Sequence, residues 1–164
     1  MAGRWTASEG QLRPDSRFGN RTLSRFINCV MRDGKKSVAE RVVYDAMDEI
    51  KARIEKQPHP AGFQSPIEVF EKAIDNAKPF VEVRSKRVGG ANYQVPMQVG
   101  PRRRQSLAFR WIIGSCRAEK GRPMHLRLAD ELLAASKGEG KAMATRDQVH
   151  RMADANKAFA HFAY

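Results

Sequence analysis

Hydrophobic residues recur along much of the chain at the spacing of amphipathic helices. In the segment 20–34 they stand at i, i+3, i+4, i+7 and i+8, which places them on one side of a helix. Gly34 is expected to end this helix, because glycine readily adopts the left-handed conformation of a helix stop. The stripe predicted to face the core consists of Leu23, Phe26, Ile27, Val30 and Met31.

Capping signals define the next two helices. Ser37 and Glu40 have the spacing of a capping box, so the second helix is expected to begin at Ser37 and to stop before Pro58. The run SPIE at 65–68 combines an N-cap serine, a proline in the first turn and a capping glutamate. It predicts the start of a third helix, which Pro79 closes.

The hydrophobic period changes from 3.6 to 2 in residues 80–99. Hydrophobic and polar residues alternate on both sides of Gly89 and Gly90, which predicts a β-hairpin with its turn at the two glycines. Pro96 cannot donate a ladder hydrogen bond, and this suits a ribbon in which both strands are edges. Because only one strand pair is visible, the ribbon is expected to project from a helical body.

Three more helices are predicted after the hairpin. One covers about 102–120, another begins near Pro123, and the last begins at Thr145, where a further capping-box motif stands. The fold class is therefore mainly α, a six-helix body with one protruding two-stranded antiparallel β-ribbon between the third and fourth helices. We divide the chain into an extended basic N-terminal arm at 1–19 and a single helical domain at 20–164.

Composition adds charge to this picture. The chain has 164 residues, of which 41% are hydrophobic and 29% charged, as in a globular protein with one core. Its net charge of +12 is concentrated, because residues 1–36 carry +5 and residues 84–122 carry +9, whereas residues 37–83 carry −3. A solubilising surface would mix the two signs, so this distribution favours a nucleic-acid footprint. A membrane span is not expected, since no apolar run is long enough to cross a bilayer. A membrane-surface partner is not expected either, since no basic helix with a large exposed apolar face is evident.

The fourth predicted helix combines arginines with hydrophobic residues. Arg103, Arg110 and Arg117 are seven residues apart, so they form one stripe along the helix. Trp111 and its apolar neighbours are expected on a different side, facing the core. Arginine presents planar pairs of donors that match phosphate oxygens, so the stripe is suited to follow a nucleic-acid backbone. Alternatively, one or two arginines of this helix pair with carboxylates of the acidic middle segment.

The predicted ribbon is basic near its turn, at Arg84, Lys86 and Arg87. A two-stranded ribbon is narrow enough to reach into a nucleic-acid groove. Tyr93 either stacks on a base or packs within the ribbon, and packing is the commoner role of a tyrosine in an alternating strand. The alternative to an RNA-binding protein is therefore a DNA-binding architectural protein that uses the basic β-ribbon.

No catalytic or metal-binding set of residues is evident. The run GKKS at 34–37 lacks the earlier glycine of a P-loop and has lysine where that motif needs serine or threonine. The four histidines have no cysteine or serine partner at a suggestive spacing, and Cys29 and Cys116 lie in apolar helical patterns. We therefore expect two reduced, buried thiols, no cofactor, no metal and no enzymatic activity.

Three long blocks of the sequence resemble the small-ribosomal-subunit protein seven family, bacterial type. They are RDGKKSVAERVVYDA at 32–46, PFVEVRSKRVGGANYQVPMQV at 79–99 followed by PRRRQSLAFRWI, and DQVHRMADANKAFAH at 147–161. The resemblance implies a helical body with a protruding β-ribbon and no enzymatic activity. It also implies a structural role in the small ribosomal subunit, with direct binding of ribosomal RNA (rRNA) that nucleates assembly of the subunit head.

The resemblance has further implications for place and neighbours. It implies a position near the exit-site tRNA and the mRNA exit path, and contacts with the neighbouring ribosomal proteins nine and eleven. The expected location is the cytoplasmic ribosome, with an organellar ribosome as the open alternative. The start of the chain shows no transit segment, which favours a bacterial origin.

Candidate RNA-contacting residues are basic and stand in the matched blocks or in the arginine stripe. The principal candidates are Lys35, Lys36, Arg84, Lys86, Arg87, Arg102, Arg103, Arg104 and Arg110. Weaker candidates for contact with RNA or tRNA come from the arm, the ribbon, the fourth helix and the last block. They are Arg4, Arg13, Arg17, Arg117, Tyr93, His150, Arg151, Asn156 and Lys157.

Overall fold

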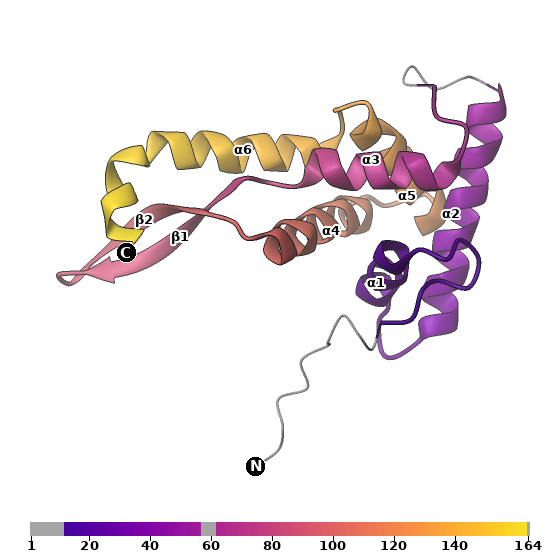
Figure 1. Ribbon diagram of the computed structural model, residues 1–164, viewed down its shortest axis with the longest axis horizontal. Helices are drawn as coiled ribbons and strands as arrows, with labels where there is room; N and C mark the ends of the chain where they lie inside the picture. The colour runs from indigo at the N-terminus through magenta and orange to yellow at the C-terminus, as the bar shows by residue number, and fades with distance from the viewer. Residues whose placement is uncertain (1–11, 57–61, 164) are drawn as a thin grey trace, which may run out of the picture.

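The computed structural model describes residues 12–56 and 62–163. These residues form an elongated molecule in which a helical body continues into a β-ribbon and a helix at one end (Figure 1). This confirms the predicted mainly α fold with an antiparallel ribbon between the third and fourth helices, and the 3-10 helix η1 is an addition. The elements in chain order are α1 (Arg21–Val30), α2 (Lys36–Lys56), α3 (Pro66–Ala77), β1 (Val81–Val88), β2 (Ala91–Gln98), α4 (Pro101–Ala118), α5 (Met124–Ser136), α6 (Lys141–Ala155) and η1 (Lys157–Ala163).

Helix α1 begins where the pattern predicts but ends early. The side chain of Asn20 accepts hydrogen bonds from two backbone N–H groups of the first turn. The expectation that Gly34 ends the helix was wrong, because α1 stops at Val30 and Gly34, with a φ of +71°, shapes the connection to α2 instead. The reason lies in another helix: Nη2 of Arg117 in α4 donates to the carbonyl oxygen of Val30 at 3.0 Å and satisfies this helix end.

The capping boxes of α2 and α3 differ from their predicted form. Helix α2 begins at Lys36, so Ser37 lies inside the first turn and not at the N-cap. Helix α3 begins directly after Ser65, as predicted, but the Ser65 side chain makes no capping hydrogen bond. Glu68 contributes instead, because its carboxylate accepts a hydrogen bond from the backbone N–H of Gln64 at 3.2 Å.

Helix α6 begins at Lys141, and the predicted start at Thr145 was wrong. A carboxylate from α5 makes the difference, since Oε1 of Glu131 accepts a hydrogen bond from the backbone N–H of Ala142 at 2.7 Å. Gly140 precedes the helix with a φ of +101°, a conformation that other residues rarely adopt. Thr145 lies in the second turn, where its hydroxyl donates to the carbonyl oxygen of Lys141 at 2.9 Å.

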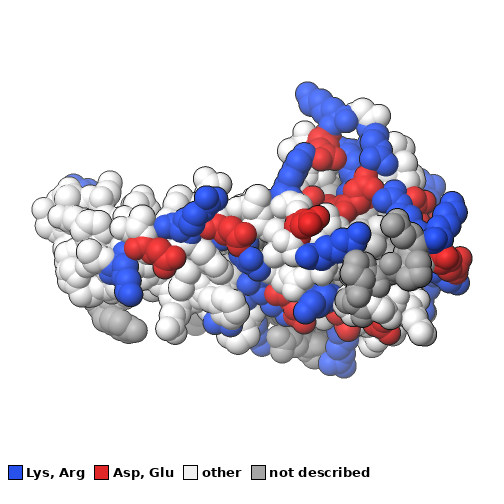
Figure 2. Space-filling view, turned by 90° about the horizontal axis from the view of Figure 1, so that it is seen from above, with Lys and Arg blue, Asp and Glu red and all other residues white. Residues whose placement is uncertain are grey.

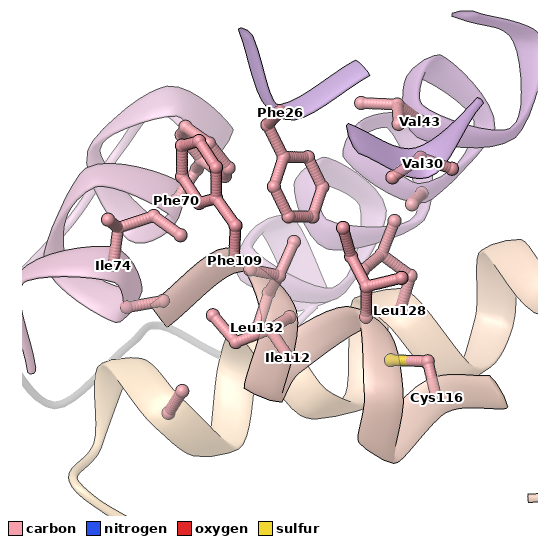
Figure 3. Close-up of a cluster of buried hydrophobic side chains, with 14 of the residues drawn as sticks. Phe26, Val30, Val43, Phe70, Ile74, Phe109, Ile112, Cys116, Leu128 and Leu132 are labelled. Atoms are coloured by element: carbon pink, nitrogen blue, oxygen red, sulfur yellow. The ribbon is translucent and has the colours of Figure 1, made fainter. Parts of the chain in front are cut away.

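The hydrophobic faces of α1 to α5 converge on one core (Figure 3). At its centre the ring of Phe26 in α1 meets Phe70 of α3 and Phe109 of α4 edge to face, at centroid distances of 5.3 and 5.2 Å. Leu128 and Leu132 of α5 are fully buried beside this cluster. Three helices are therefore joined by a single aromatic cluster, which fixes which side of α4 faces solvent.

The two thiols differ in exposure. Cys116 in α4 is buried, and burial raises the pKa of its thiol to about 12. Cys29 is exposed, so the expectation that both thiols are buried was wrong for this residue. The apolar stripe of α1 uses Ile27 and Val30, whereas Asn28 and Cys29 between them fall on the solvent side. Both cysteines are free thiols.

We expect one thiol per folded chain to react with a maleimide at about pH 7.5. Cys29 should be labelled in the folded state because it is exposed, although partial desolvation raises the pKa of its thiol and slows the reaction. Cys116 should react only after denaturation, because it is buried and its thiolate is scarce at that pH. Intact-mass spectrometry before and after addition of guanidinium measures the two stages. A Cys29→Ser variant is the control and should lose the label of the folded state. Two labels on the folded wild type would contradict the packing of α4.

The ribbon does not project alone. Strands β1 and β2 are antiparallel, with Val88 opposite Ala91 across Gly89 and Gly90, and both glycines have the positive φ that a two-residue hairpin turn requires. Helix α6 runs beside the ribbon, and η1 folds back onto it (Figure 1). The prediction of a protruding ribbon is confirmed, with α6 and η1 added along it.

The described part of the predicted arm, residues 12–19, forms a turn next to α2. The carboxylate of Asp15 is buried there and accepts a hydrogen bond from the hydroxyl of Tyr44 at 2.5 Å. The same carboxylate also accepts hydrogen bonds from two backbone N–H groups of its own turn. This turn joins the start of α1 to α2, and the boundary between arm and domain stays a prediction.

Candidate nucleic-acid interface

Three principal candidates occupy the first turn of α4, where the ribbon joins the helical body. They are Arg102, Arg103 and Arg104. Nε of Arg104 donates to the carbonyl oxygen of Val99 at 2.8 Å. The guanidinium carbon of Arg104 also lies 5.0 Å from the ring centroid of Phe80. Arg104 is therefore held against the root of the ribbon by a hydrogen bond and by the contact of its guanidinium group with an aromatic ring.

A buried carboxylate joins the ribbon to α4. Glu82 of β1 is only 8% exposed, and it accepts hydrogen bonds from Nε of Arg84 at 2.6 Å and from Nε of Arg103 at 3.2 Å. Because Glu82 belongs to the acidic middle segment, the alternative that an arginine of the fourth helix pairs with this segment holds for Arg103. Arg84 and Arg103 thus have a structural partner, although both side chains remain about half exposed.

The arginine stripe along α4 has three different surroundings. Arg110 is exposed and makes no hydrogen bond or ion pair with any residue that the structure describes. Arg103 bonds to the ribbon and Arg117 to α1, as given above, and burial together with the nearby Arg32 lowers the pKa of Arg117. Trp111, which was expected to face the core, is partly buried against it. Arg110 is therefore the member of the stripe with its donors open to a phosphate.

The connection between α1 and α2 presents two lysines. Lys35 is exposed, and its ammonium group has no partner among the described residues, whereas Nζ of Lys36 lies 3.7 Å from the carboxylate of Glu40. An open cavity of about 460 Å³ lies beside Lys35. Its charged lining consists of four cations and one carboxylate, so it favours an anion. These charged residues are Arg32, Asp33, Lys35, Arg117 and Arg127.

The candidates on the ribbon also include residues with and without a partner within the protein. The side chain of Arg87 is exposed next to the turn and forms no ion pair or hydrogen bond within the described part of the chain. Nζ of Lys86 donates to the carbonyl oxygen of Phe162 at 2.7 Å. Tyr93 packs against Phe159 and Phe162 of η1, at centroid distances of 5.3 and 5.1 Å. Of its two expected roles, the structure therefore shows packing.

The candidates of the last sequence block lie on α6 and η1. Nε2 of His150 accepts a hydrogen bond from the backbone N–H of Phe80 at 3.2 Å, and the amide of Asn156 donates to a carbonyl of its own helix. Arg151 and Lys157 are exposed. His150 and Asn156 thus have local structural partners.

The arm contributes two described candidates. Arg13 is exposed beside a pocket that also contains Lys36. Arg17 forms an ion pair with Asp48 of α2, where Nη1 donates to the carboxylate at 3.0 Å. Arg4 lies outside the described residues.

The elements that carry the principal candidates lie along one long side of the molecule. The ribbon, α4 and the α1–α2 connection follow the lower side of Figure 1, whereas α6 follows the upper side. Figure 2, seen from above, shows basic side chains interleaved with acidic ones over the body on that face. We use the name "unpaired cations" for the three principal candidates whose side chains have no hydrogen-bond or ion-pair partner, in backbone or side chain, within residues 12–56 and 62–163. They are Lys35, Arg87 and Arg110.

Sequence reasoning missed Phe80, which stands between α3 and β1. Its side chain is 63% exposed, and the ring of His150 lies beside it at a centroid distance of 6.1 Å. One signal was available, because Phe80 shares the register of Glu82 and Arg84 on the polar side of the alternating pattern. An aromatic residue in that register points to a surface role.

Metal and membrane sites receive no support from the described residues. They contain no group of three or more histidine, cysteine, aspartate or glutamate side chains that could hold a metal ion. None of their helices combines the length and the apolar character that a membrane crossing requires.

Comparison with known proteins agrees with this arrangement. The sequence matches the family described as Ribosomal protein S7p/S5e over residues 3–157. Small ribosomal subunit protein uS7 of Rhodopirellula baltica is 60% identical over 162 residues, which cover 99% of each chain. Proteins of the same name from Cupriavidus necator and Chromobacterium violaceum are 55% identical over 151 residues (92% of each chain) and 51% identical over 164 residues (100% of each chain). The chain belongs to the Ribosomal protein S7p/S5e family, as its three sequence blocks indicated.

Proposed function

We propose that this protein is a structural constituent of the small ribosomal subunit that binds rRNA directly. Membership in a ribosomal protein family makes it a structural protein and not an enzyme, in agreement with the prediction from the sequence. Its similar relatives are bacterial proteins of the small subunit, so its location is the cytoplasmic ribosome. The proposed function is therefore structural, and it depends on rRNA binding and on the shape of the protein.

The unpaired cations are the observation that supports direct rRNA binding most strongly. Within the described residues the fold leaves Lys35, Arg87 and Arg110 exposed and without a side-chain partner, although 18 acidic residues are present in the chain. A chain with a net charge of +12 repels itself, and an anionic partner relieves that repulsion. Phosphate oxygens are suitable partners, since guanidinium groups bind them through two parallel donors.

We infer recognition through phosphates and shape, without a base-sequence code. A-form RNA has a deep and narrow major groove that side chains cannot read, so its backbone and its junctions are the accessible features. Glu82 of β1 accepts a hydrogen bond from Arg103 of α4 and so fastens the ribbon to this helix, which holds the cations of the two elements at a constant spacing. A rigid basic scaffold of this kind suits a junction of RNA helices.

The proposal includes the finer roles that the resemblance implies. Binding nucleates assembly of the subunit head, and the protein lies near the exit-site tRNA and the mRNA exit path. Ribosomal proteins nine and eleven are its neighbours. The elongated form is consistent with two kinds of contact, because the body offers an RNA-binding side while the ribbon, α6 and η1 extend away from it (Figure 1).

We expect small-subunit rRNA to compete for the protein at about 100-fold lower concentration than duplex DNA of equal nucleotide content. Filter binding of labelled rRNA, with either competitor added at one fixed salt concentration, measures this ratio. Equal competition by the duplex would favour the alternative of a DNA-binding architectural protein. Co-sedimentation of the native protein with small subunits in a cell extract is the second measurement, and a protein found only in the soluble fraction would oppose the proposal.

A further inference from the structure

We propose that Phe80 and Arg104 form a stacking platform for one unpaired RNA base at the root of the ribbon. The inference rests on the proposed RNA-binding function and adds a site of a different chemical kind. Basic residues bind phosphates, whereas this platform binds the flat face of a base.

The backbone holds Phe80 in place while its ring stays exposed. The carbonyl oxygen of Phe80 accepts a hydrogen bond from the backbone N–H of Val99 at 3.0 Å, and its own N–H donates to Nε2 of His150 at 3.2 Å. The side chain is nevertheless 63% exposed. The ring is therefore positioned without being buried, so it can accept a ligand at little cost in conformational entropy.

Two further planar groups stand beside this ring. The guanidinium carbon of Arg104 is 5.0 Å from the ring centroid, and Nε of the same group is anchored on the carbonyl oxygen of Val99 at 2.8 Å. The imidazole of His150 lies 6.1 Å away, tilted by 34°. Phenylalanine, arginine and histidine are side chains on which unstacked RNA bases lie. A single exposed hydrophobic residue is ordinary, but this grouping of three planes is suited to stacking.

Charge favours RNA over a protein side chain as the occupant. Arg104 lies against the ring, and Arg102 and Arg103 precede it in the first turn of α4. The nearby carboxylate of Glu82 already accepts hydrogen bonds from two arginines. A nucleotide on Phe80 would therefore have its phosphate in a positive environment, whereas an apolar protein segment would gain nothing from these charges.

Substitutions at Phe80 separate stacking from apolar contact. Phe80→Ala and Phe80→Leu should each raise the Kd for small-subunit rRNA about 5-fold to 100-fold, whereas Phe80→Trp should bind at least as well as wild type, because stacking needs a ring. Filter binding at one salt concentration measures the four Kd values. Met152→Ala is the matched control, since Met152 is exposed and apolar but has no ring, and it should change the Kd by less than about 2-fold.

The Phe80→Trp variant also reports stacking directly. Its fluorescence should be quenched on addition of rRNA, beyond the change that wild type shows through Trp5 and Trp111. Unchanged circular dichroism is expected for every variant, because the ring is mostly exposed.

Two results would overturn the platform and leave the proposed function intact. One is a wild-type Kd for Phe80→Ala. The other is equal binding by the leucine and tryptophan variants without extra quenching, which would indicate an apolar contact. A wild-type protein that fails to bind rRNA would instead remove the proposed function itself.

Discussion

The affinity of this protein for small-subunit rRNA should fall at least about 1000-fold between about 50 and 200 mM monovalent salt. Each phosphate that a lysine or arginine neutralises releases condensed counterions, so the logarithm of the binding constant falls linearly with the logarithm of the salt concentration. The stated loss corresponds to about six phosphate contacts or more. Filter-binding titrations at several salt concentrations give the slope, and a flat response would refute an electrostatic interface.

The same slope tests where the contacts lie. A triple variant, Lys35→Gln, Arg87→Gln and Arg110→Gln, removes the unpaired cations and should make the slope shallower by about 2 to 3. At low salt its affinity should also be at least about 100-fold lower. Arg103 is left out of this variant because it is bonded to the buried Glu82, and its loss would disturb the attachment of the ribbon.

A second triple variant is the control for net charge. It removes three exposed lysines from the C-terminal half of α2 and from α3, segments that carry none of the principal candidates, and therefore changes the total charge by the same amount. Its slope should stay within about 1 of the wild-type slope. Equal losses in the two variants would mean that total charge, and not placement, governs binding. The substitutions are Lys51→Gln, Lys56→Gln and Lys72→Gln.

Phe26→Ala should lower the free energy of unfolding by about 3 to 5 kcal/mol. Phe26 is fully buried, and its ring contacts the rings of Phe70 and Phe109, so alanine would leave a cavity where α1, α3 and α4 meet. A domain of this size has a total stability of about 5 to 15 kcal/mol, so the loss is a large part of it. Urea denaturation followed by circular dichroism measures the change.

Two further variants make the stability test decisive. Phe26→Leu keeps most of the apolar volume without the ring contacts and should lose about 1 to 2 kcal/mol, so it gives a value even where Phe26→Ala does not fold. Met152→Ala removes an exposed apolar side chain and should stay within about 0.5 kcal/mol of wild type. A loss below about 1 kcal/mol for Phe26→Ala would contradict the central place of this ring.

Hydrophobic periodicity alone predicted the helices and strands whose geometry is set by residues close together in the sequence. The i, i+3, i+4 spacing of Leu23, Phe26 and Ile27 identified the buried face of α1, and all three are fully buried. Alternation around Gly89 and Gly90 identified the ribbon and its turn. Such patterns are readable because a helix or a strand places its side chains by local geometry.

The ends of helices depended on residues far away in the chain. Arg117 satisfies the last carbonyl of α1, and Glu131 satisfies an N–H group at the start of α6. The capping box at Thr145 is a local signal. It did not set the start of α6, where the carboxylate of Glu131 from α5 accepts the backbone hydrogen bond instead. Helix ends carry unsatisfied backbone groups, and any side chain that the fold brings near can satisfy them.

The sequence also could not predict which candidate residues have a partner within the protein and which do not. Arg103, Arg110 and Arg117 share one stripe by spacing, yet only Arg110 lacks a partner among the described residues. Which arginine meets a carboxylate or a carbonyl depends on how α4 packs against β1 and α1. Phe80 gained its planar neighbours Arg104 and His150 for the same reason.

By itself the sequence determined the helical and ribbon elements, the buried stripe of α1, the concentration of positive charge and the resemblance to a ribosomal protein family. These features follow from local periodicity, composition and ordered motifs. Only the tertiary structure decided where α1 ends and where α6 begins, that Cys29 is exposed, and which cations are left for a phosphate. The physical reason is that hydrogen bonds and ion pairs form between groups close in space, and packing of the core brings together residues that are far apart in the chain.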